Sequence, residues 1–155
     1  MVAYRILRPD DANALAMLHA ATFETPWSPA ALRSELAKPS ALGMALLLPD
    51  DDTQIISFVL FQRVGETAEM LTLATAPMHQ KQGHARALLK AGFDHLCERG
   101  VTRCLLDVAA DNRAAIALYL ALGFIEDGRR QSYYKRPGQN PVDAILMSKS
   151  FRPAS

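Results

Sequence analysis

Runs of apolar positions divide the first half of the chain into strands separated by short polar breaks. The apolar runs fall at residues 4–7, 42–48, 54–64 and 70–75. Their length, and the turn residues that bound them, favour strands over helices. The second and third runs are joined by a turn at residues 49–52, and the third and fourth by Gly65–Glu66. Since these links are too short for crossovers, we expect the last three strands to form an antiparallel meander.

Two helices are predicted between the first and second strands. The first, opened by a proline, runs to about Phe23 with its apolar positions on one stripe. The second is capped by Ser28, has Pro29 at its first position and ends by Pro39. The loop between the helices carries Trp27, the only tryptophan. Such a loop is either a substrate wall or a packing corner.

Helical spacing returns after Gly83 and ends at Gly100, a residue type that favours a helix C-terminus. A further apolar run at residues 101–108 predicts the next strand. Strand, helix and strand therefore follow one another. The strands at 70–75 and 101–108 are expected to be parallel neighbours with a right-handed crossover.

The last third of the chain predicts one helix and a hairpin. Asp111 or Asn112 caps the helix, and Gly123 ends it. Strands at residues 124–134 and 142–147 then pair around a proline- and glycine-containing turn. The complete order is a mixed α/β chain without internal repeats.

Length and charge restrict the class of protein. The 155 residues fit one domain, residues 1–150, with a loose tail at 151–155. A net charge of +1 provides no basic surface for nucleic acid or for an anionic membrane. Apolar runs are too short to span a bilayer, and residues 1–5 lead directly into a strand. We therefore expect neither a nucleic-acid nor a membrane partner.

The cysteines and histidines bear on compartment and metal binding. Cys97 and Cys104 form no C-x-x-C pair, which favours reduced thiols and a cytoplasmic location. The histidines lack the spacing of metal ligands, so no metal site is predicted. They are His19, His79, His84 and His95.

A small-residue loop between the strand at 70–75 and the following helix is the first candidate site. Gly83 and Ala85 let an anion approach the backbone closely, and the first amides of the helix have no partners within it. This combination is typical of a phosphate-binding loop. The alternative is an ordinary turn that happens to contain a glycine.

The second candidate site lies at the end of the strand at 101–108 and on the helix that follows. Asp107 is near the carboxyl end of its strand, where open sheets bind ligands. Asn112 and Tyr119 are seven residues apart and share a helix face. If the parallel strands diverge, a long thin ligand fits between them beside all three. Otherwise the three residues are a strand-end cap, a helix cap and a core aromatic packed near Phe124.

The segment Gln80-Lys81-Gln82-Gly83-His84-Ala85 resembles the acetyl-CoA pyrophosphate loop of the GNAT acetyltransferases, Q/R-x-x-G-x-G/A. Residues 112–119, NRAAIALY, followed by Leu122-Gly123-Phe124, resemble the RimI branch, which acetylates the N-terminal alanine of ribosomal proteins. Pro26-Trp27-Ser28 and the last hairpin match as well. The resemblance implies a mixed, mostly antiparallel seven-stranded sheet with a central parallel pair, flanked by about four helices.

The resemblance also implies how acetyl-CoA is held. The backbone of Leu73, Ala74 and Thr75 is expected to hold the pantetheine and orient the thioester. The pyrophosphate is expected to be wrapped by Lys81, Gln82, Gly83, His84, Ala85 and Arg86. Asn112 is expected to contact the cofactor.

Tyr119 falls where the family has the general acid that protonates the departing thiolate. Asp107 falls where the RimI branch carries a glutamate as general base, and its side chain is shorter by roughly 1.5 Å. A water molecule can bridge that gap. A second candidate base is Glu69, where the histone-acetylating branch carries its catalytic glutamate; otherwise it is a solvated strand end.

The expected reaction is direct attack of a neutral amine on acetyl-CoA, without a covalent enzyme intermediate. The expected acceptor is the α-amine of a protein N-terminus, an alanine of a ribosomal protein. Tyr133 and Tyr134 are expected to wall its site, and Glu24 and Asp143 to receive a basic peptide. The alternatives are an enzyme acting on a small-molecule amine and a non-catalytic acetyl-CoA sensor.

Overall fold

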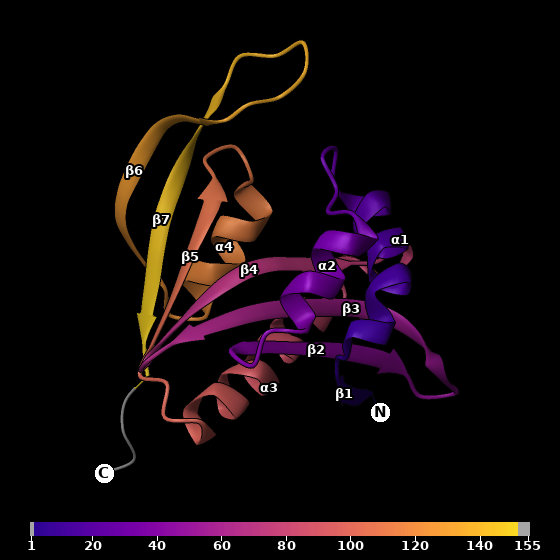
Figure 1. The fold of residues 1–155 in the computed structure, drawn as a ribbon. Coiled ribbons are helices and arrows are strands. Elements are labelled where there is room, and N and C mark those ends of the chain that lie inside the picture. The colour runs from indigo at the N-terminus through magenta and orange to yellow at the C-terminus, as the bar shows by residue number, and fades with distance from the viewer. Residues whose placement is uncertain (1, 152–155) are drawn as a thin grey trace.

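Seven strands form one sheet in the order β1-β2-β3-β4-β5-β7-β6 (Figure 1). The computed structural model describes residues 2–151, and of residues 51–53 the backbone alone. The strands are β1 Ala3–Ile6, β2 Ala41–Leu48, β3 Asp51–Val64, β4 Thr67–Thr75, β5 Arg103–Ala109, β6 Ile125–Tyr134 and β7 Val142–Ser150. The helices are α1 Ala12–Thr22, α2 Pro29–Leu36, α3 His84–Glu98 and α4 Arg113–Ala121, with 3₁₀ turns at Pro9–Asp11 and Pro77–His79.

This architecture confirms the predicted mixed sheet with its central parallel pair and four flanking helices. β2, β3 and β4 form the predicted antiparallel meander, while β4 and β5 are parallel. The turn expected at residues 49–52 is shorter than predicted, since Leu48 already pairs with Asp51. Proline and aspartate therefore make the turn at 49–50 alone, and β3 begins directly after it.

The parallel pairing of β4 with β5 is short, and this produces a gap in the sheet. Only residues 67–69 of β4 pair with residues 103–105 of β5. Beyond Glu69 and Leu105 the two strands diverge, and each continues against its other neighbour alone. Figure 1 shows the consequence: β2–β4 form one arm and β5–β7 the other, joined at one end and open at the other. The sheet therefore has two free inner edges facing a gap.

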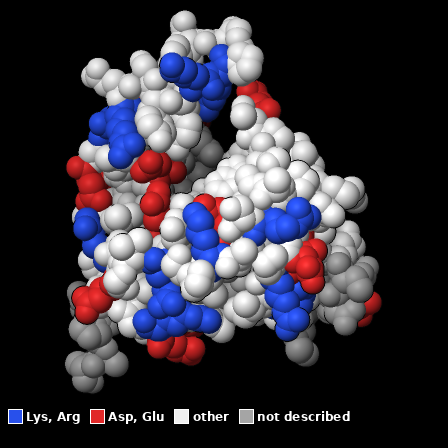
Figure 2. Space-filling view, viewed as in Figure 1, with Lys and Arg blue, Asp and Glu red and all other residues white. Residues whose placement is uncertain are grey.

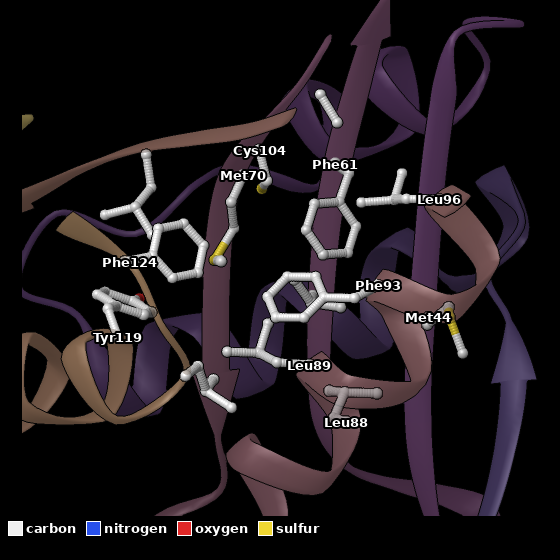
Figure 3. Close-up of a cluster of buried hydrophobic side chains, with 14 of the residues drawn as sticks. Met44, Phe61, Met70, Leu88, Leu89, Phe93, Leu96, Cys104, Tyr119 and Phe124 are labelled. Atoms are coloured by element: carbon white, nitrogen blue, oxygen red, sulfur yellow. The ribbon is translucent and has the colours of Figure 1, made fainter. Parts of the chain in front are cut away.

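Two hydrophobic cores cover opposite faces of the first arm. One packs α3 and α4 against the sheet around Phe61, Phe93 and Phe124, as Figure 3 shows. The other packs α1 and α2 around Leu15, Leu32 and Phe58. A Cβ atom added at Gly92 would lie 2.9 Å from the ring of Phe61. The absence of a side chain at that position lets α3 approach β3 closely.

Side-chain caps set the start of two helices. The Ser28 hydroxyl accepts the amide hydrogen of Ala31 at 3.1 Å, as predicted. Asn112, rather than Asp111, caps α4, since its Oδ1 accepts the amide hydrogen of Ala115 at 3.2 Å. The carboxylate of Asp111 is turned instead toward the last hairpin.

The predicted loose tail is wrong at its first residue. The Phe151 amide donates to the carbonyl of Thr102 at 2.8 Å, and its ring lies 5.3 Å from that of Phe93. Burial of this aromatic ring holds the end of β7 against the core. Residues 152–155 of the predicted tail lie outside the described residues. No helix among residues 2–151 is long and apolar enough to cross a membrane.

Candidate functional site

A cavity of about 750 Å³ occupies the gap between the two arms. Its walls come from β4, β5 and α4, from the loop between α1 and α2, and from the end of β6. In Figure 2 the surface is hollowed between the arms, with acidic and basic side chains on the rim. The cavity thus forms where the parallel strands stop pairing.

Asp107, Asn112 and Tyr119 all line this cavity, together with Leu73. The sequence-based expectation that diverging strands bring the first three beside one space is therefore met in the geometry. Asp107 is exposed, on the strand beyond the last parallel pair. Asn112 faces the same cavity from the start of α4, where it also caps the helix.

Tyr119 is both a core aromatic and a cavity residue. It is 7% exposed, and its ring lies 5.7 Å from that of Phe124. Burial raises the pKa of its hydroxyl to about 12, and the nearby phenol of Tyr134 adds to the effect. The Tyr119 hydroxyl therefore keeps its proton at neutral pH and acts as a hydrogen-bond donor.

Glu24, Tyr133 and Tyr134 also line the cavity, whereas Glu69, Ala74, Thr75 and residues 81–86 do not. Glu69 is exposed at the last parallel pair, on the closed side of the gap. Ala74 is buried in the α1–α2 core, and Thr75 hydrogen-bonds through its hydroxyl to Ser57 at 2.9 Å. Residues 81–86 follow on the open end of β4 and lead into α3.

The loop before α3 has the backbone shape that a glycine permits. Gly83 takes φ +82°, in the left-handed region, and Lys81 takes φ +62°. The side-chain Nε2 of Gln80 donates to the carbonyl of Thr75 at 3.1 Å and anchors the start of the loop to β4. No side chain caps the N-terminus of α3. The first amides of an α-helix have no partner within it, and Lys81 and Arg86 flank this helix start in the sequence, a combination that suits an anion.

His19 lines the cavity but was not assigned a role from sequence. It is 2% exposed, its Nε2 lies 2.9 Å from the Thr72 hydroxyl, and its Nδ1 accepts the Trp27 amide hydrogen at 3.1 Å. Its ring stacks on Phe23 at 4.1 Å. Burial lowers its pKa to about 4. One feature of the sequence does indicate that His19 is buried: it lies four residues after Leu15, on the buried stripe of α1.

The rim carries charged groups from both arms. Arg136, beyond β6, makes a two-pronged ion pair with Asp111 at 2.5 and 2.9 Å. This contact lowers the pKa of the Asp111 carboxyl. Glu24 lies on the cavity wall, whereas Asp143, expected from sequence beside it, instead accepts the Ser132 amide hydrogen at 2.9 Å and is not part of the lining.

The comparisons with known proteins agree with this geometry. Residues 12–124 match the sequence profile of the Acetyltransferase (GNAT) family. The chain belongs to the GNAT acetyltransferase family. The match begins with α1 and ends just before β6, so it includes the parallel pair, the loop before α3 and α4.

Several of the proteins that this chain resembles are N-terminal acetyltransferases. The [ribosomal protein bS18]-alanine N-acetyltransferase of Escherichia coli is 41% identical over 95 residues, 61% of this chain and 64% of that protein. The crystal structure of the Escherichia coli ribosomal-protein-S18-alanine N-acetyltransferase superimposes with a TM-score of 0.91, at 32% identity, covering 100% of this chain and 97% of that one. Arabidopsis thaliana NAA60 in complex with acetyl-CoA shares the fold, with a TM-score of 0.84 at 22% identity, over 97% and 98% of the two chains.

The buried, neutral imidazole of His19 predicts a pH-dependent stability. The unfolded chain takes up a proton near pH 6.5, whereas the folded protein resists it until about pH 4. Since the unfolded state binds more protons between these values, the free energy of unfolding should fall as pH drops from 6.5 toward 4 and this contribution should level off below. Urea titrations at several pH values measure it.

The control is His19→Gln, which can keep both hydrogen bonds but does not titrate. Its stability should depend less on pH between 6.5 and 4 than that of the wild type. The depressed pKa values of Asp11 and Asp111 affect stability chiefly below this window, because both lie below 3.8. Parallel curves for the two proteins would contradict a neutral, buried His19.

Proposed function

We propose that this protein transfers the acetyl group of acetyl-CoA to the free α-amine of a protein N-terminus, specifically an alanine of a ribosomal protein. The observation that carries the proposal is the cavity between the arms, which places a carboxylate, Asp107, and a protonated phenol, Tyr119, around one space. The similarity to bS18-alanine N-acetyltransferases supports the choice of acceptor.

In this proposal the cofactor enters along the open end of β4. Residues 81–86 wrap the pyrophosphate, supported by the uncapped amides of α3 and by Lys81 and Arg86. Leu73, Ala74 and Thr75 hold the pantetheine through their backbone. The short parallel pairing of β4 with β5 supports this placement of the pantetheine. Beyond Glu69 no β5 residue pairs with β4, so a ligand that contains amides can hydrogen-bond to β4 in place of a strand. Asn112 contacts the cofactor from across the gap.

Asp107 is proposed as the base and Tyr119 as the group that meets the departing thiolate. A phenol with a pKa of about 12 cannot readily protonate a thiolate whose conjugate acid titrates near 8.5. Tyr119 therefore stabilises the developing sulfur charge mainly by hydrogen bonding. Asp107 takes the amine proton through a water molecule, because its side chain is shorter than the glutamate of the RimI branch. Glu69, on the closed side of the gap, is the second candidate.

An α-amine suits such a base. Its pKa is near 8, against about 10.4 for lysine, so roughly a tenth of α-amines but well under a hundredth of lysines are neutral near pH 7. A carboxylate that is short, or that acts through a water molecule, therefore limits the rate of acetylation less for an N-terminal acceptor than for a lysine acceptor. Two free thiols, exposed Cys97 and buried Cys104, fit the cytoplasm as the place of this reaction. The net charge of +1 supports no direct contact with nucleic acid.

The first test concerns the phosphate loop. Gly83→Val should weaken acetyl-CoA binding at least about 10-fold, since a β-branched residue cannot readily hold the left-handed conformation that presents the loop amides. Isothermal calorimetry measures the affinity. Gly65→Val is the matched control, because Gly65 also has a positive φ (+61°) with open space around it, in the turn between β3 and β4. Equal loss of affinity in both variants would contradict the assignment.

The second test separates the proposed catalytic groups. Tyr119→Phe should lower kcat by about 100-fold, the lower end for loss of one donor that stabilises developing charge, with acetyl-CoA affinity retained. Asp107→Asn should move the pH–rate profile more than Glu69→Gln, and Asp107→Glu should raise kcat if side-chain length limits the base. Steady-state kinetics across pH measures these effects. The reverse ranking of the two carboxamide variants would assign the base to β4.

The third test identifies the acceptor. Peptides that begin with alanine should be acetylated at their α-amine, whereas the same peptides with a blocked N-terminus and an internal lysine should react far more slowly. Mass spectrometry locates the acetyl group. Preference for polyamines would favour a small-molecule acetyltransferase, and acetyl-CoA binding without turnover of any amine would favour a sensor. Equal or faster reaction of the blocked peptide would overturn the N-terminal assignment.

A further inference from the structure

His19 of α1 links the loop between α1 and α2 to the sheet through two hydrogen bonds. The ring of His19 lies between Thr72 on β4 and the backbone of Trp27 in the loop, at 2.9 and 3.1 Å. Phe23 stacks on one side of the ring at 4.1 Å, and Phe58 of the α1–α2 core lies 6.2 Å away. With only 2% of its surface exposed, the imidazole links these elements in a setting that solvent barely reaches.

The two hydrogen bonds determine the tautomer. A backbone N–H can only donate, so Nδ1 of His19 must accept from Trp27 and carries no hydrogen. In the neutral ring the hydrogen is then on Nε2, which donates to the Thr72 hydroxyl. Both nitrogens are occupied. His19 is therefore not available as a proton acceptor for a substrate amine, although it lines the cavity.

The Thr72 hydroxyl is oriented by the same contact. Since its oxygen accepts from His19, its own hydrogen is free to donate elsewhere, and Thr72 lines the cavity. Thr72 belongs to the free part of β4, three residues beyond the last parallel pair. His19 thus acts on two walls of the cavity at once: the Trp27 loop and the inner edge of β4.

We propose that His19 is the positioning residue of the acceptor site, which holds the Trp27 loop at a fixed distance from β4 and directs the Thr72 hydroxyl into the cavity. The proposal rests on the proposed function only in taking the cavity as the place where the acceptor amine binds. A loop detached from β4 enlarges the acceptor side of the cavity. The phosphate loop begins beyond Thr75 and the 3₁₀ turn at Pro77–His79, and the hydrogen bonds of His19 go to Thr72 and Trp27, so we expect the phosphate loop to be unaffected.

Trp27 fluorescence tests the attachment without any need for activity, because Trp27 is the only tryptophan in the chain. His19→Ala should shift its emission to the red and raise acrylamide quenching about twofold or more, as a freed loop admits solvent. His19→Gln should restore the wild-type spectrum, since its amide can accept from Trp27 and donate to Thr72. Unchanged quenching in His19→Ala would overturn the proposal.

Kinetics then shows whether the attachment serves the acceptor. His19→Ala removes both hydrogen bonds of the ring and should raise the KM for the acceptor at least about 10-fold, since a net loss of about 1.4 kcal/mol is tenfold, while acetyl-CoA affinity stays within about twofold. His19→Gln should recover most of the loss. Thr72→Val keeps the Trp27 contact and should raise KM with a smaller change in quenching. Thr72→Val also keeps the test usable if His19→Ala does not fold.

Leu15→Ala is the matched control for general loosening. Leu15 is a fully buried residue of α1, one turn before His19, and its truncation costs stability without touching the loop contact. Its acceptor KM and Trp27 quenching should stay near wild type. If Leu15→Ala raises both as much as His19→Ala does, His19 has no positioning role. If the wild type acetylates no N-terminus, the proposed function fails, and Trp27 quenching still decides the attachment.

Discussion

The limited pairing of two parallel strands is the constraint on which the rest of the structure depends. β4 and β5 share three residue pairs and then separate. Each strand stays paired with its other neighbour, β4 with β3 and β5 with β7, so the sheet remains continuous on both sides of the gap. The inner edges carry backbone groups that no strand of the described residues satisfies. A ligand with amide groups of its own matches these edges, and the proposed function puts the pantetheine of acetyl-CoA there.

The charges around the gap fit the same arrangement. Near the open end of β4 the side chains are basic and the helix amides are free, which suits phosphate. On the other side Glu24 and Asp107 line the cavity, while the nearby Arg136 is paired with Asp111. Under the proposed function the two substrates meet walls of different charge, and the carboxylates lie on the wall assigned to the amine.

The sequence predicted the order of the elements and three residues that line the gap, Asp107, Asn112 and Tyr119. The features that it did not predict have physical causes. Apolar runs, caps and glycines are local signals, and they correctly indicated the meander, Ser28 and the crossover at Gly83. The choice between Asp111 and Asn112 as the α4 cap needed the position of Arg136, which comes from a hairpin 25 residues away. The anchoring of Phe151 likewise depends on Phe93 in α3. His19 was missed because its partners, Thr72 and the Trp27 backbone, meet it only in the folded chain.

The strands of the two arms are buried to different extents, so local unfolding should differ between the arms. β2 and β3 carry cores on both faces, and from Leu42 to Leu47 every residue of β2 is buried. β6, by contrast, lies at the free edge of the sheet with nearly all of its residues exposed. Backbone amides of β3 should exchange with deuterium only on global unfolding, whereas those of β6 exchange through local opening. Tyr133 and Tyr134, the proposed acceptor wall, thus belong to an exposed edge strand, and local opening of β6 would let a peptide enter or leave without disturbing the buried strands β2 and β3.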